Sequence, residues 1–289
     1  PQKFTRNVWF TDKDENQALS LRYTGETLFD KTSPFQRVRV METYGYGKTL
    51  TIDNMFMCTE KDEHHYHEMI SHPAILAHGN VKNVLVIGGG DGGTVREVLK
   101  HHAVEKVTMV EIDELVIEAC KEHLPTISSA FGHPKLDLII GDGIDFVAKA
   151  QDSAYDLIIV DGSDPVGPAE GLFSSEFYTN CQRALTANGL LVTQGESPMF
   201  NSETFVELNN CLKTIYGADK VSTLLFQVPT YPSGIWSFQV ASKGGVNPAV
   251  PQQELGQSFE QDNKLNYYNS DLHSSAFALP NYVKRMLNE

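Results

Sequence analysis

The sequence predicts an α/β protein with a Rossmann-like, methyltransferase-type open sheet and a small N-terminal antiparallel β domain. Three observations predict this fold. From residue 83 onward, short apolar runs alternate with segments of helical periodicity, the first run ends in a glycine-rich loop, and residues 1–60 contain only strand-like runs between turn formers. We therefore divide the chain into a β domain, residues 1–60, and a Rossmann-like domain, residues 61–289.

The first 60 residues show no helix-length periodicity. Their apolar residues partly alternate with polar ones, and turn formers such as Gly25, Pro34 and the Gly45-Tyr46-Gly47 tip interrupt them. This pattern predicts a small antiparallel sheet with strands over residues 18–23, 27–32, 36–43, 48–52 and 55–59.

Residues 62–78 are predicted to form a helix that carries several histidines. A metal site is not expected there, because His67 and His72 are five positions apart and their rings would lie about 140° apart on a helix. We expect instead that Tyr66 and His67 line a substrate pocket. A solvated helix face is expected for two further histidines, His64 and His65.

The stretch from Asn83 to Asp113 organises the second domain. Residues 84–87 form a short apolar run with β-branched residues, which is typical of a strand covered on both faces. The glycines of residues 88–93 make a tight turn that lets the backbone approach a ligand closely. A helix over 94–102 and a second buried strand over 107–112 complete a βαβ unit, which resembles a nucleotide- or nucleoside-binding half-sheet.

Two acids suggest what this unit binds. A pyrophosphate would favour the positive N-terminus of the following helix, and the carboxylate of Asp91 inside the loop would repel it. Asp91 therefore either caps that helix or receives a cation. Glu111 stands where an acid grips the ribose hydroxyls in such folds. A positively charged nucleoside fits both residues better than a dinucleotide does.

The α/β alternation continues after the central unit. Three more strands are expected before a closing hairpin, with helices between them, so the sheet has seven strand candidates and a final antiparallel pair. The expected strands are residues 135–140, 155–160 and 189–193, the hairpin is 221–228 with 235–241, and the helices are 115–124, 144–149, 174–185 and 202–216. A Gln/Pro/Gly-rich loop is expected over 243–263 and a short final helix over 280–287.

Acids follow four successive strands of this sheet. In open α/β sheets the ligand lies beyond the carboxyl ends of the strands, so these acids should line one negatively charged site rather than only cap helices. Asp142 could accept a hydrogen bond from an adenine amino group, with Gly143 leaving room for the ring. The four acids are Asp91, Glu111, Asp142 and Asp161.

Two further segments are candidates for substrate contacts. Residues 161–173 contain Pro165, Gly167 and Pro168, so they suit a lid better than a helix or strand, and Asp164 would face the pocket. A second lobe combines Gln194-Gly-Glu196 with residues 229–236. Two aromatic residues of this lobe are either core residues or walls of the pocket, namely Tyr231 and Trp236.

Composition narrows the class of ligand and the compartment. The formal charge of −14 argues against nucleic acid and is compatible with cationic small substrates. The four cysteines show no C-x-x-C pairing, which suggests neither a disulfide framework nor a zinc site and favours a reducing compartment. No signal-peptide pattern and no apolar run near 18 residues is found, so a cytoplasmic protein without a membrane span is expected.

Taken together, these motifs closely resemble the spermidine synthases, the aminopropyltransferases of polyamine biosynthesis. The resemblance covers nearly the whole chain and implies an N-terminal β domain, a Rossmann-like catalytic domain and a homodimer or homotetramer. The motifs that carry it are G-K-T-L-T-I-D, Tyr66-His67-Glu68, G-G-G-D-G-G, V-E-I-D, G-D-G, D-x-S-D-P-x-G-P-A, Q-G-E, P-T-Y-P-S-G and Y-Y-N-S-D-L-H.

The resemblance also implies roles for individual residues. Asp161 would accept a proton from the attacking amine, aided by the hydroxyl of Tyr66. Gly162 departs from the family, which usually has a small hydroxyl residue there, and this leaves the fine choice of amine open. The thioadenosine part would contact Gln36, Glu111, Asp142, Gly143 and Pro168. The amine groups would face Tyr66, His67, Asp91, Asp161, Asp164 and Tyr231, with Gln194 and Trp236 as further candidates.

The expected reaction moves the aminopropyl group of decarboxylated S-adenosylmethionine to putrescine and gives spermidine and methylthioadenosine. The nucleoside is a co-substrate, and no cofactor is expected. Two alternatives stay open: an S-adenosylmethionine-dependent diamine N-methyltransferase on the same sheet, and a non-catalytic polyamine or nucleoside sensor. A dehydrogenase is disfavoured because Asp91 would repel a pyrophosphate.

Overall fold

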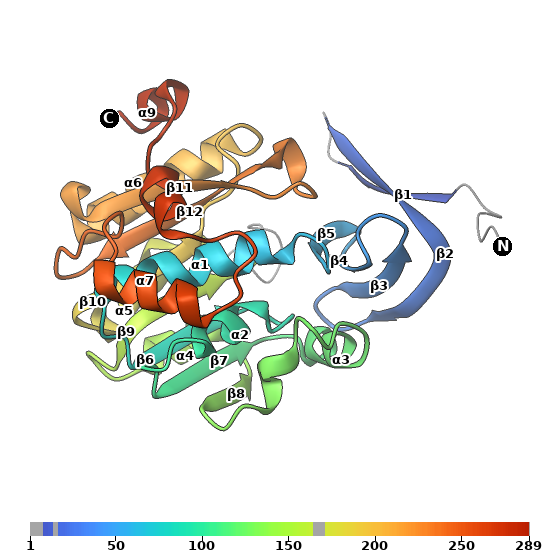
Figure 1. Cartoon of the computed structure of the whole chain (residues 1–289), viewed down its shortest axis with the longest axis horizontal. Coiled ribbons are helices and arrows are strands. Elements are labelled where there is room, and N and C mark those ends of the chain that lie inside the picture. The colour runs from blue at the N-terminus through green and yellow to red at the C-terminus, as the bar shows by residue number, and fades with distance from the viewer. Residues whose placement is uncertain (1–7, 14–16, 164–170, 289) are drawn as a thin grey trace.

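The structure is a computed structural model, and it describes residues 8–13, 17–163 and 171–288. Its first part is a five-stranded antiparallel sheet in the order β1-β2-β3-β4-β5, which lies at one end of the molecule (Figure 1). The predicted antiparallel sheet is therefore present. Its strands are β1 (Val8–Lys13), β2 (Ala18–Thr32), β3 (Arg37–Thr43), β4 (Lys48–Ile52) and β5 (Met55–Thr59).

Two details of this sheet differ from the prediction. Strand β1 was not expected, and the two runs expected on either side of Gly25 are one strand, β2. The pairing of β2 with β3 shifts register between Tyr23 and Phe29. An irregularity of this kind lets a strand bend and continue where sequence alone suggests a turn.

The second sheet has seven strands in the order β11-β12-β10-β9-β6-β7-β8, which confirms the predicted open sheet. Strands β10, β9, β6, β7 and β8 are mutually parallel, and β12 is antiparallel to both β10 and β11. The strands are β6 (Asn83–Gly88), β7 (Lys106–Glu111), β8 (Leu136–Ile140), β9 (Tyr155–Asp161), β10 (Leu185–Gln194), β11 (Val221–Gln227) and β12 (Ile235–Ser242).

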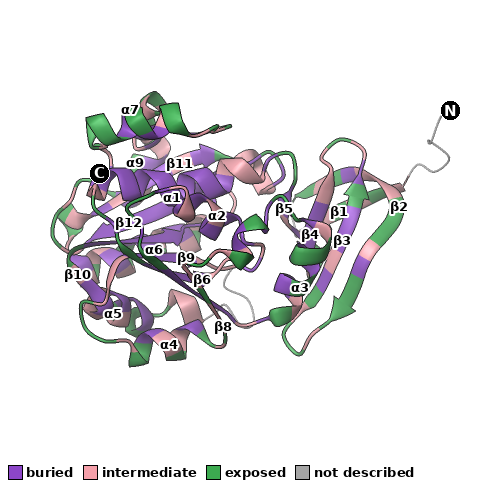
Figure 2. Ribbon diagram, turned by 60° about the horizontal axis from the view of Figure 1, so that its bottom comes forward, coloured by how far each residue is buried: buried purple, intermediate pink, exposed green. Residues whose placement is uncertain are grey.

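Helices cover both faces of this sheet because side chains of the buried strands alternate between two cores. In β6, Val84 and Val86 join the core beneath α1, whereas Leu85 and Ile87 join the core beneath α5 and α6. The purple strands in Figure 2 are accordingly sandwiched between helices. The helices concerned are α1 (Glu63–His78), α2 (Gly93–Leu99), α4 (Gly143–Lys149), α5 (Ser175–Ala184) and α6 (Ser202–Tyr216).

Helix α3 (Glu114–His123) connects the two sheets. Its Val116, Ala119 and Cys120 pack in one core with Val38, Val40 and Leu50 of the first sheet. This places α3 beside β3, as Figure 1 shows. The first sheet is therefore covered by a helix that comes from the Rossmann-like part of the chain.

The prediction of a loop over residues 243–263 is wrong in part, because α7 (Gln253–Asp262) lies within it. Leu255 and Phe259 lie four positions apart on one face of this helix, but only Gly256 and Phe259 are buried. The surrounding Gln, Pro and Gly residues favoured a loop in the sequence. The ring of Phe259 stacks on His101 at 4.0 Å, a contact that sequence does not reveal. Helix α8 (Ser270–Ala276) was not expected, whereas the expected final helix is α9 (Asn281–Leu287).

Among the described residues, no helix has both the length and the apolar character that crossing a membrane requires. The same part of the chain contains no group of three or more His, Cys, Asp or Glu side chains arranged to hold a metal ion.

Candidate active site

The order of the strands brings the predicted acids together. Asp161 at the end of β9 pairs with Gly88 at the end of β6, and Glu111 at the end of β7 pairs with Ile140 at the end of β8. The chain reverses its direction of strand addition between β6 and β9, which is where ligands bind in doubly wound sheets. The site thus follows directly from the sheet topology.

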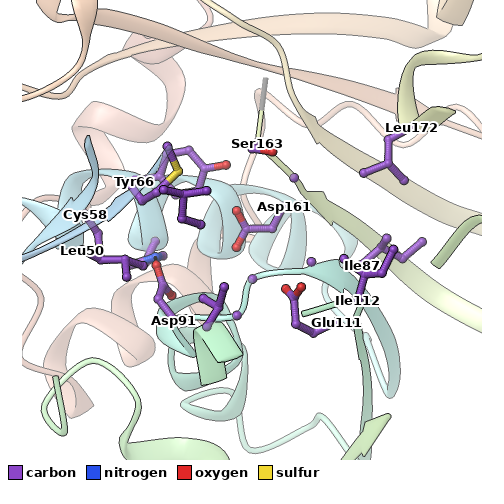
Figure 3. Close-up of a pocket in the computed structure, with 18 of the residues that line it drawn as sticks. Leu50, Cys58, Tyr66, Ile87, Asp91, Glu111, Ile112, Asp161, Ser163 and Leu172 are labelled. Carbon is purple, nitrogen blue, oxygen red and sulfur yellow. Dashed lines mark ion pairs between the residues drawn. The ribbon is translucent and has the colours of Figure 1, made fainter. Parts of the chain in front are cut away.

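A cavity of about 1130 Å³, counting space that is open to solvent, lies at this edge. It is lined by the loop after β6, by the ends of β7 and β9, by the start of α1 and by strands of the first sheet. Figure 3 shows the carboxylates of Asp91, Glu111 and Asp161 within it, together with Tyr66. Gln36, His67, Asp142, Gly143 and Tyr231 also line it.

Asp161 is held from two sides. Thr94 Oγ1 donates a hydrogen bond of 2.6 Å to Asp161 Oδ2, and the Tyr66 hydroxyl also interacts with the carboxylate. Burial and the charge of Asp91 raise the pKa of Asp161, and burial together with Asp161 raises the pKa of Tyr66 well above its ordinary value. Gly88, with a φ of 80°, leaves room for the Asp161 carbonyl, which would lie 2.2 Å from a Cβ atom at that position.

Asp91 contacts the start of α2 with one oxygen and His67 with the other. Its Oδ1 accepts a 2.7 Å hydrogen bond from the Gly93 amide, and its Oδ2 lies 3.2 Å from His67 Nε2. Oδ1 therefore contacts the first residue of α2, as expected for a residue that stabilises the helix start. That the loop receives a cationic ligand stays a prediction. Although burial alone would raise the pKa of Asp91, His67 lowers it below its ordinary value.

Glu111 is buried at the floor of the cavity. Burial raises the pKa of Glu111 to about 7, although its Oε1 accepts a 2.9 Å hydrogen bond from the Asp113 amide. The side chain of Asp113 in turn accepts a hydrogen bond of 3.0 Å from Gln36 Nε2. Gln36, in the turn between β2 and β3, is thereby fixed beside the strand end that carries Glu111.

Asp142 is an exposed residue that caps α4. Its Oδ1 accepts from the amide of Ile144 at 2.8 Å, so helix capping and cavity lining coincide here. Gly143 was expected to leave space for a ring. A Cβ atom at Gly143 would lie 2.4 Å from Ile87 Cγ2, so packing against Ile87 already requires glycine at this position.

A second cavity adjoins Tyr66 and is lined by Gln194, Tyr231 and Trp236. Trp236 is 4% exposed, and its Nε1 donates a hydrogen bond of 3.1 Å to Gln194 Oε1. It is therefore both a core residue and part of the wall of this cavity. Tyr231 donates its hydroxyl to the Met57 carbonyl at 2.7 Å, which leaves its ring facing Trp236 and Tyr66.

The expectation for His65 is wrong in part, and most of the predicted lid lies outside the described residues. His65 is not simply solvated, because its Nδ1 lies 2.8 Å from the Gln227 carbonyl and its ring lies 4.2 Å from that of Tyr267. The predicted lid falls mostly on residues 164–170, so Asp164 and Pro168 lie outside the described residues.

Sequence reasoning missed three residues that touch the predicted site. Thr94 bonds Asp161, Asp113 joins Gln36 to Glu111, and Glu63 contacts His67. For two of these residues the sequence contains a pattern that could have predicted the contact. Glu63 precedes His67 by four positions, which places both on one helix face, and Asp113 ends the V-E-I-D motif.

The fold and the site define a Rossmann-like, methyltransferase-type enzyme whose acidic cavity is also lined by residues of an N-terminal β sheet. Comparison with known proteins agrees and is more specific. The profile of the spermine/spermidine synthase domain matches residues 63–253, and that of the spermidine synthase tetramerisation domain matches residues 8–60. The chain belongs to the spermine/spermidine synthase family, the polyamine aminopropyltransferases.

Individual relatives match over almost their whole length. The polyamine aminopropyltransferase of Alkaliphilus metalliredigens is 45% identical over 285 residues, which cover 97% of this chain and 98% of that one. The polyamine aminopropyltransferase of Methanocaldococcus jannaschii is 45% identical over 283 residues, covering 97% and 95%.

Solved structures agree in fold. A crystal structure of spermidine synthase in complex with the transition state analogue AdoDATO superposes with a TM-score of 0.93 at 36% identity and covers 98% of this chain and 96% of that one. Spermidine synthase from Thermotoga maritima superposes with a TM-score of 0.91 at 36% identity, covering 97% and 94%.

Proposed function

We propose that this enzyme transfers the aminopropyl group of decarboxylated S-adenosylmethionine to putrescine, giving spermidine and methylthioadenosine. The observation that carries the proposal is the cavity in which Asp91, Glu111 and Asp161 converge. Both substrates are cations, and an acidic cavity concentrates cations. A family member that binds the transition state analogue AdoDATO supports the same reading.

The thioadenosine part of the donor would lie over the ends of β7 and β8. Glu111 would accept hydrogen bonds from the ribose hydroxyls and Asp142 one from the adenine amino group. Gln36 would close this part from the first sheet, held there by its hydrogen bond to Asp113. Gly143 and Pro168 would contact the ring.

The amine groups would lie on the other side of the glycine loop. Asp91, positioned by His67, would bind the ammonium of the aminopropyl chain. The second cavity adjoins Tyr66 and would hold putrescine. Its contacts would come from Asp164, Gln194, Tyr231 and Trp236.

The chemical step is a displacement at the methylene carbon beside sulfur. The attacking amine, with an ordinary pKa near ~10.4, must first be neutral, so only about one molecule in 10³ is competent at pH 7. Asp161, aided by Tyr66, would take the proton while the nitrogen lone pair forms the new C–N bond. The C–S bond breaks, its electron pair stays on sulfur, and the sulfonium becomes a neutral thioether.

This reaction would need neither a metal ion nor a redox cofactor, because the sulfonium already makes its neighbouring carbon electrophilic. We further propose that the enzyme is a homodimer or homotetramer assembled through its first sheet, which matches the tetramerisation domain. It would act in the cytoplasm on small molecules and without nucleic acid, as its charge of −14 suggests.

Product identification tests the proposal. The enzyme is incubated with decarboxylated or intact S-adenosylmethionine and with putrescine, cadaverine, agmatine or spermidine, and the products are identified by mass spectrometry. Addition of an aminopropyl group to putrescine is expected with the decarboxylated donor. Addition of a methyl group from the intact donor would identify a methyltransferase instead, and binding without turnover would identify a sensor.

A further inference from the structure

His67 lies between two carboxylates that both face its ring nitrogens. Nδ1 is 2.5 Å from Glu63 Oε2, and Nε2 is 3.2 Å from Asp91 Oδ2. A carboxylate only accepts hydrogen bonds, and a neutral imidazole has only one N–H. Both contacts are therefore satisfied together when His67 carries two protons and Glu63 and Asp91 are ionised.

The surroundings of both carboxylates favour their ionised forms. Arg96 Nη2 donates to Glu63 Oε2 at 2.8 Å, and the Gly93 amide donates to Asp91 Oδ1 at 2.7 Å. Arg96 is itself held in place, since its Nε donates a hydrogen bond of 2.8 Å to Glu97 Oε1. Acidic and basic side chains thus alternate from the cavity into the protein in the order Asp91, His67, Glu63, Arg96 and Glu97.

Further titratable groups near His67 come from two other elements and from α1 itself. Cys58 lies on β5, Asp161 ends β9, and Tyr66 of α1 packs its ring edge-on at 5.6 Å. Burial raises the pKa of the Cys58 thiol, so it remains neutral. Burial alone would lower the pKa of His67, but Asp91 and Glu63 raise it well above its ordinary value.

The ring of His67 packs directly against the backbone of Gly93. A Cβ atom at Gly93 would lie 2.2 Å from both Cε1 and Nδ1 of His67. Gly93, the last glycine of the G-G-G-D-G-G motif, therefore makes room for a histidine of α1. With Gly93 against it and a carboxylate at each nitrogen, the 2% exposed side chain of His67 is restricted to one orientation.

We propose that Glu63 and Arg96 are positioning residues for the donor: they hold His67 as an imidazolium, which fixes the Asp91 carboxylate toward the cavity. This proposal rests on the proposed function only for the identity of the ligand that Asp91 receives. The charge state of His67 belongs to the ligand-free protein. Asp91 then meets the donor with its carboxylate already oriented by His67.

The first test needs no substrate. Ring nitrogens of histidine are followed by NMR in the full-length, ligand-free enzyme from pH 5 to 9. His67 is expected to remain an imidazolium at pH 7, where exposed histidines have lost their second proton. In Glu63→Gln its midpoint should fall by about 1 to 3 pH units, the usual effect of losing a nearby carboxylate. A neutral His67 at pH 7 in the unchanged enzyme overturns the proposal.

The second test separates positioning from folding. Calorimetry compares binding of decarboxylated S-adenosylmethionine with that of methylthioadenosine, which lacks the aminopropyl ammonium. Glu63→Gln should weaken the donor about tenfold, the lower end of the effect of carboxylates that orient histidine ligands at metal sites, and leave methylthioadenosine within about twofold. Equal weakening of both ligands would instead mean a purely structural role and would overturn the proposal.

The chain supplies a matched control. Glu118→Gln makes the same chemical change in the exposed Lys31–Glu118 ion pair, in which both side chains are about half exposed. It should change neither the His67 midpoint nor either affinity. If the unchanged enzyme forms no spermidine, the proposed function fails while the NMR result still decides the state of His67.

Discussion

Asp161 combines three features that a proton acceptor needs. It faces the cavity, it receives hydrogen bonds from Thr94 and Tyr66, and burial with Asp91 nearby raises its pKa toward the range in which it binds a proton more readily. Its backbone is fixed as well, because the Gly89 amide donates to its carbonyl at 2.9 Å. The carboxylate is therefore held before substrate arrives.

Replacement of Asp161 by Asn should lower kcat by about 10² to 10⁴, the usual contribution of a general base. Affinity for methylthioadenosine should hardly change, since Glu111 and Asp142 lie elsewhere in the cavity. Raising the pH should recover part of the lost rate, because solvent then removes the proton from the amine. Steady-state kinetics from pH 7 to 9 measure this, and a near-normal kcat at saturating amine would exclude Asp161 as the acceptor.

Glu111 makes folding stability depend on pH. The pKa of its carboxyl is about 7 in the folded protein and 4.5 ordinarily, so the folded state binds more protons between these values. Stability conferred by this residue is thus full below pH 4.5 and is lost as the pH rises through 7. The cost of the buried charge at pH 8 is about 3 kcal/mol.

Glu111→Gln should therefore be more stable than the unchanged enzyme at pH 8, by up to about 3 kcal/mol, and similar to it near pH 4.5. The same variant should bind the donor more weakly, because the amide cannot accept from two ribose hydroxyls as a carboxylate does. Urea unfolding at several pH values measures the first effect. A stability difference that does not change with pH would contradict the raised pKa.

At this scale the sequence predicted residue types better than residue partners. Acids after parallel strands were expected to converge, and Asp91, Glu111, Asp142 and Asp161 do line one cavity. That His67 bonds Asp91 depends on a contact between α1 and the glycine loop, which no local pattern encodes. The roles assigned to these residues remain predictions.

Helix α1 and the residue before it bind two segments that are distant in sequence. Its Glu68 is 1% exposed and accepts backbone hydrogen bonds from Asn266, Tyr267 and Tyr268 at 2.7 to 2.8 Å. Asp62 just before α1 accepts from both the amide and the hydroxyl of Thr230. Two segments far away in sequence are thereby attached to α1.

Glu68→Ala should destabilise the fold by about 3 kcal/mol or more, because each buried N–H left without a partner costs roughly 1 to 3 kcal/mol. Glu68→Gln should cost less, since its carbonyl oxygen still accepts. Affinity for methylthioadenosine should be unchanged at temperatures where both variants are folded. Thermal unfolding followed by circular dichroism measures the loss, and equal melting temperatures for Glu68→Ala and the unchanged enzyme would contradict this role.

Elements with apolar periodicity were predicted well, and elements stabilised by tertiary contacts were not. The seven strands of the second sheet were predicted from their apolar runs. Helix α7 buries only two residues, and its position depends on Phe259 packing against His72 and His101. The pattern in its own sequence is short, because Leu255 and Phe259 are its only two large apolar residues, and the Gln, Pro and Gly residues around them favour a loop.

For the whole molecule, the charge of −14 bears on the encounter with cationic substrates. Negative potential around an acidic cavity attracts cations from solution, and salt screens it over about 10 Å at 0.1 M. Salt should therefore slow the association of substrates with the site rather than the chemical step.

Increasing sodium chloride from 0.05 to 0.5 M should lower kcat/KM for both substrates by roughly 2- to 10-fold, with kcat itself nearly constant. Initial rates at low and at saturating substrate measure the two quantities. A kcat that falls in parallel with kcat/KM would indicate an effect of salt on the fold or the chemical step instead.

The core shared by α3 and the first sheet has a consequence for synthesis on the ribosome. Val38, Val40 and Leu50 leave the exit tunnel well before Leu124 and Ile127, the residues of the α3 region that cover them. The N-terminal sheet therefore remains partly uncovered until the nascent chain has passed the βαβ unit. Folding of this protein is then not strictly from the N-terminus onward, because the first sheet completes its core only after the region of α3 has been synthesised.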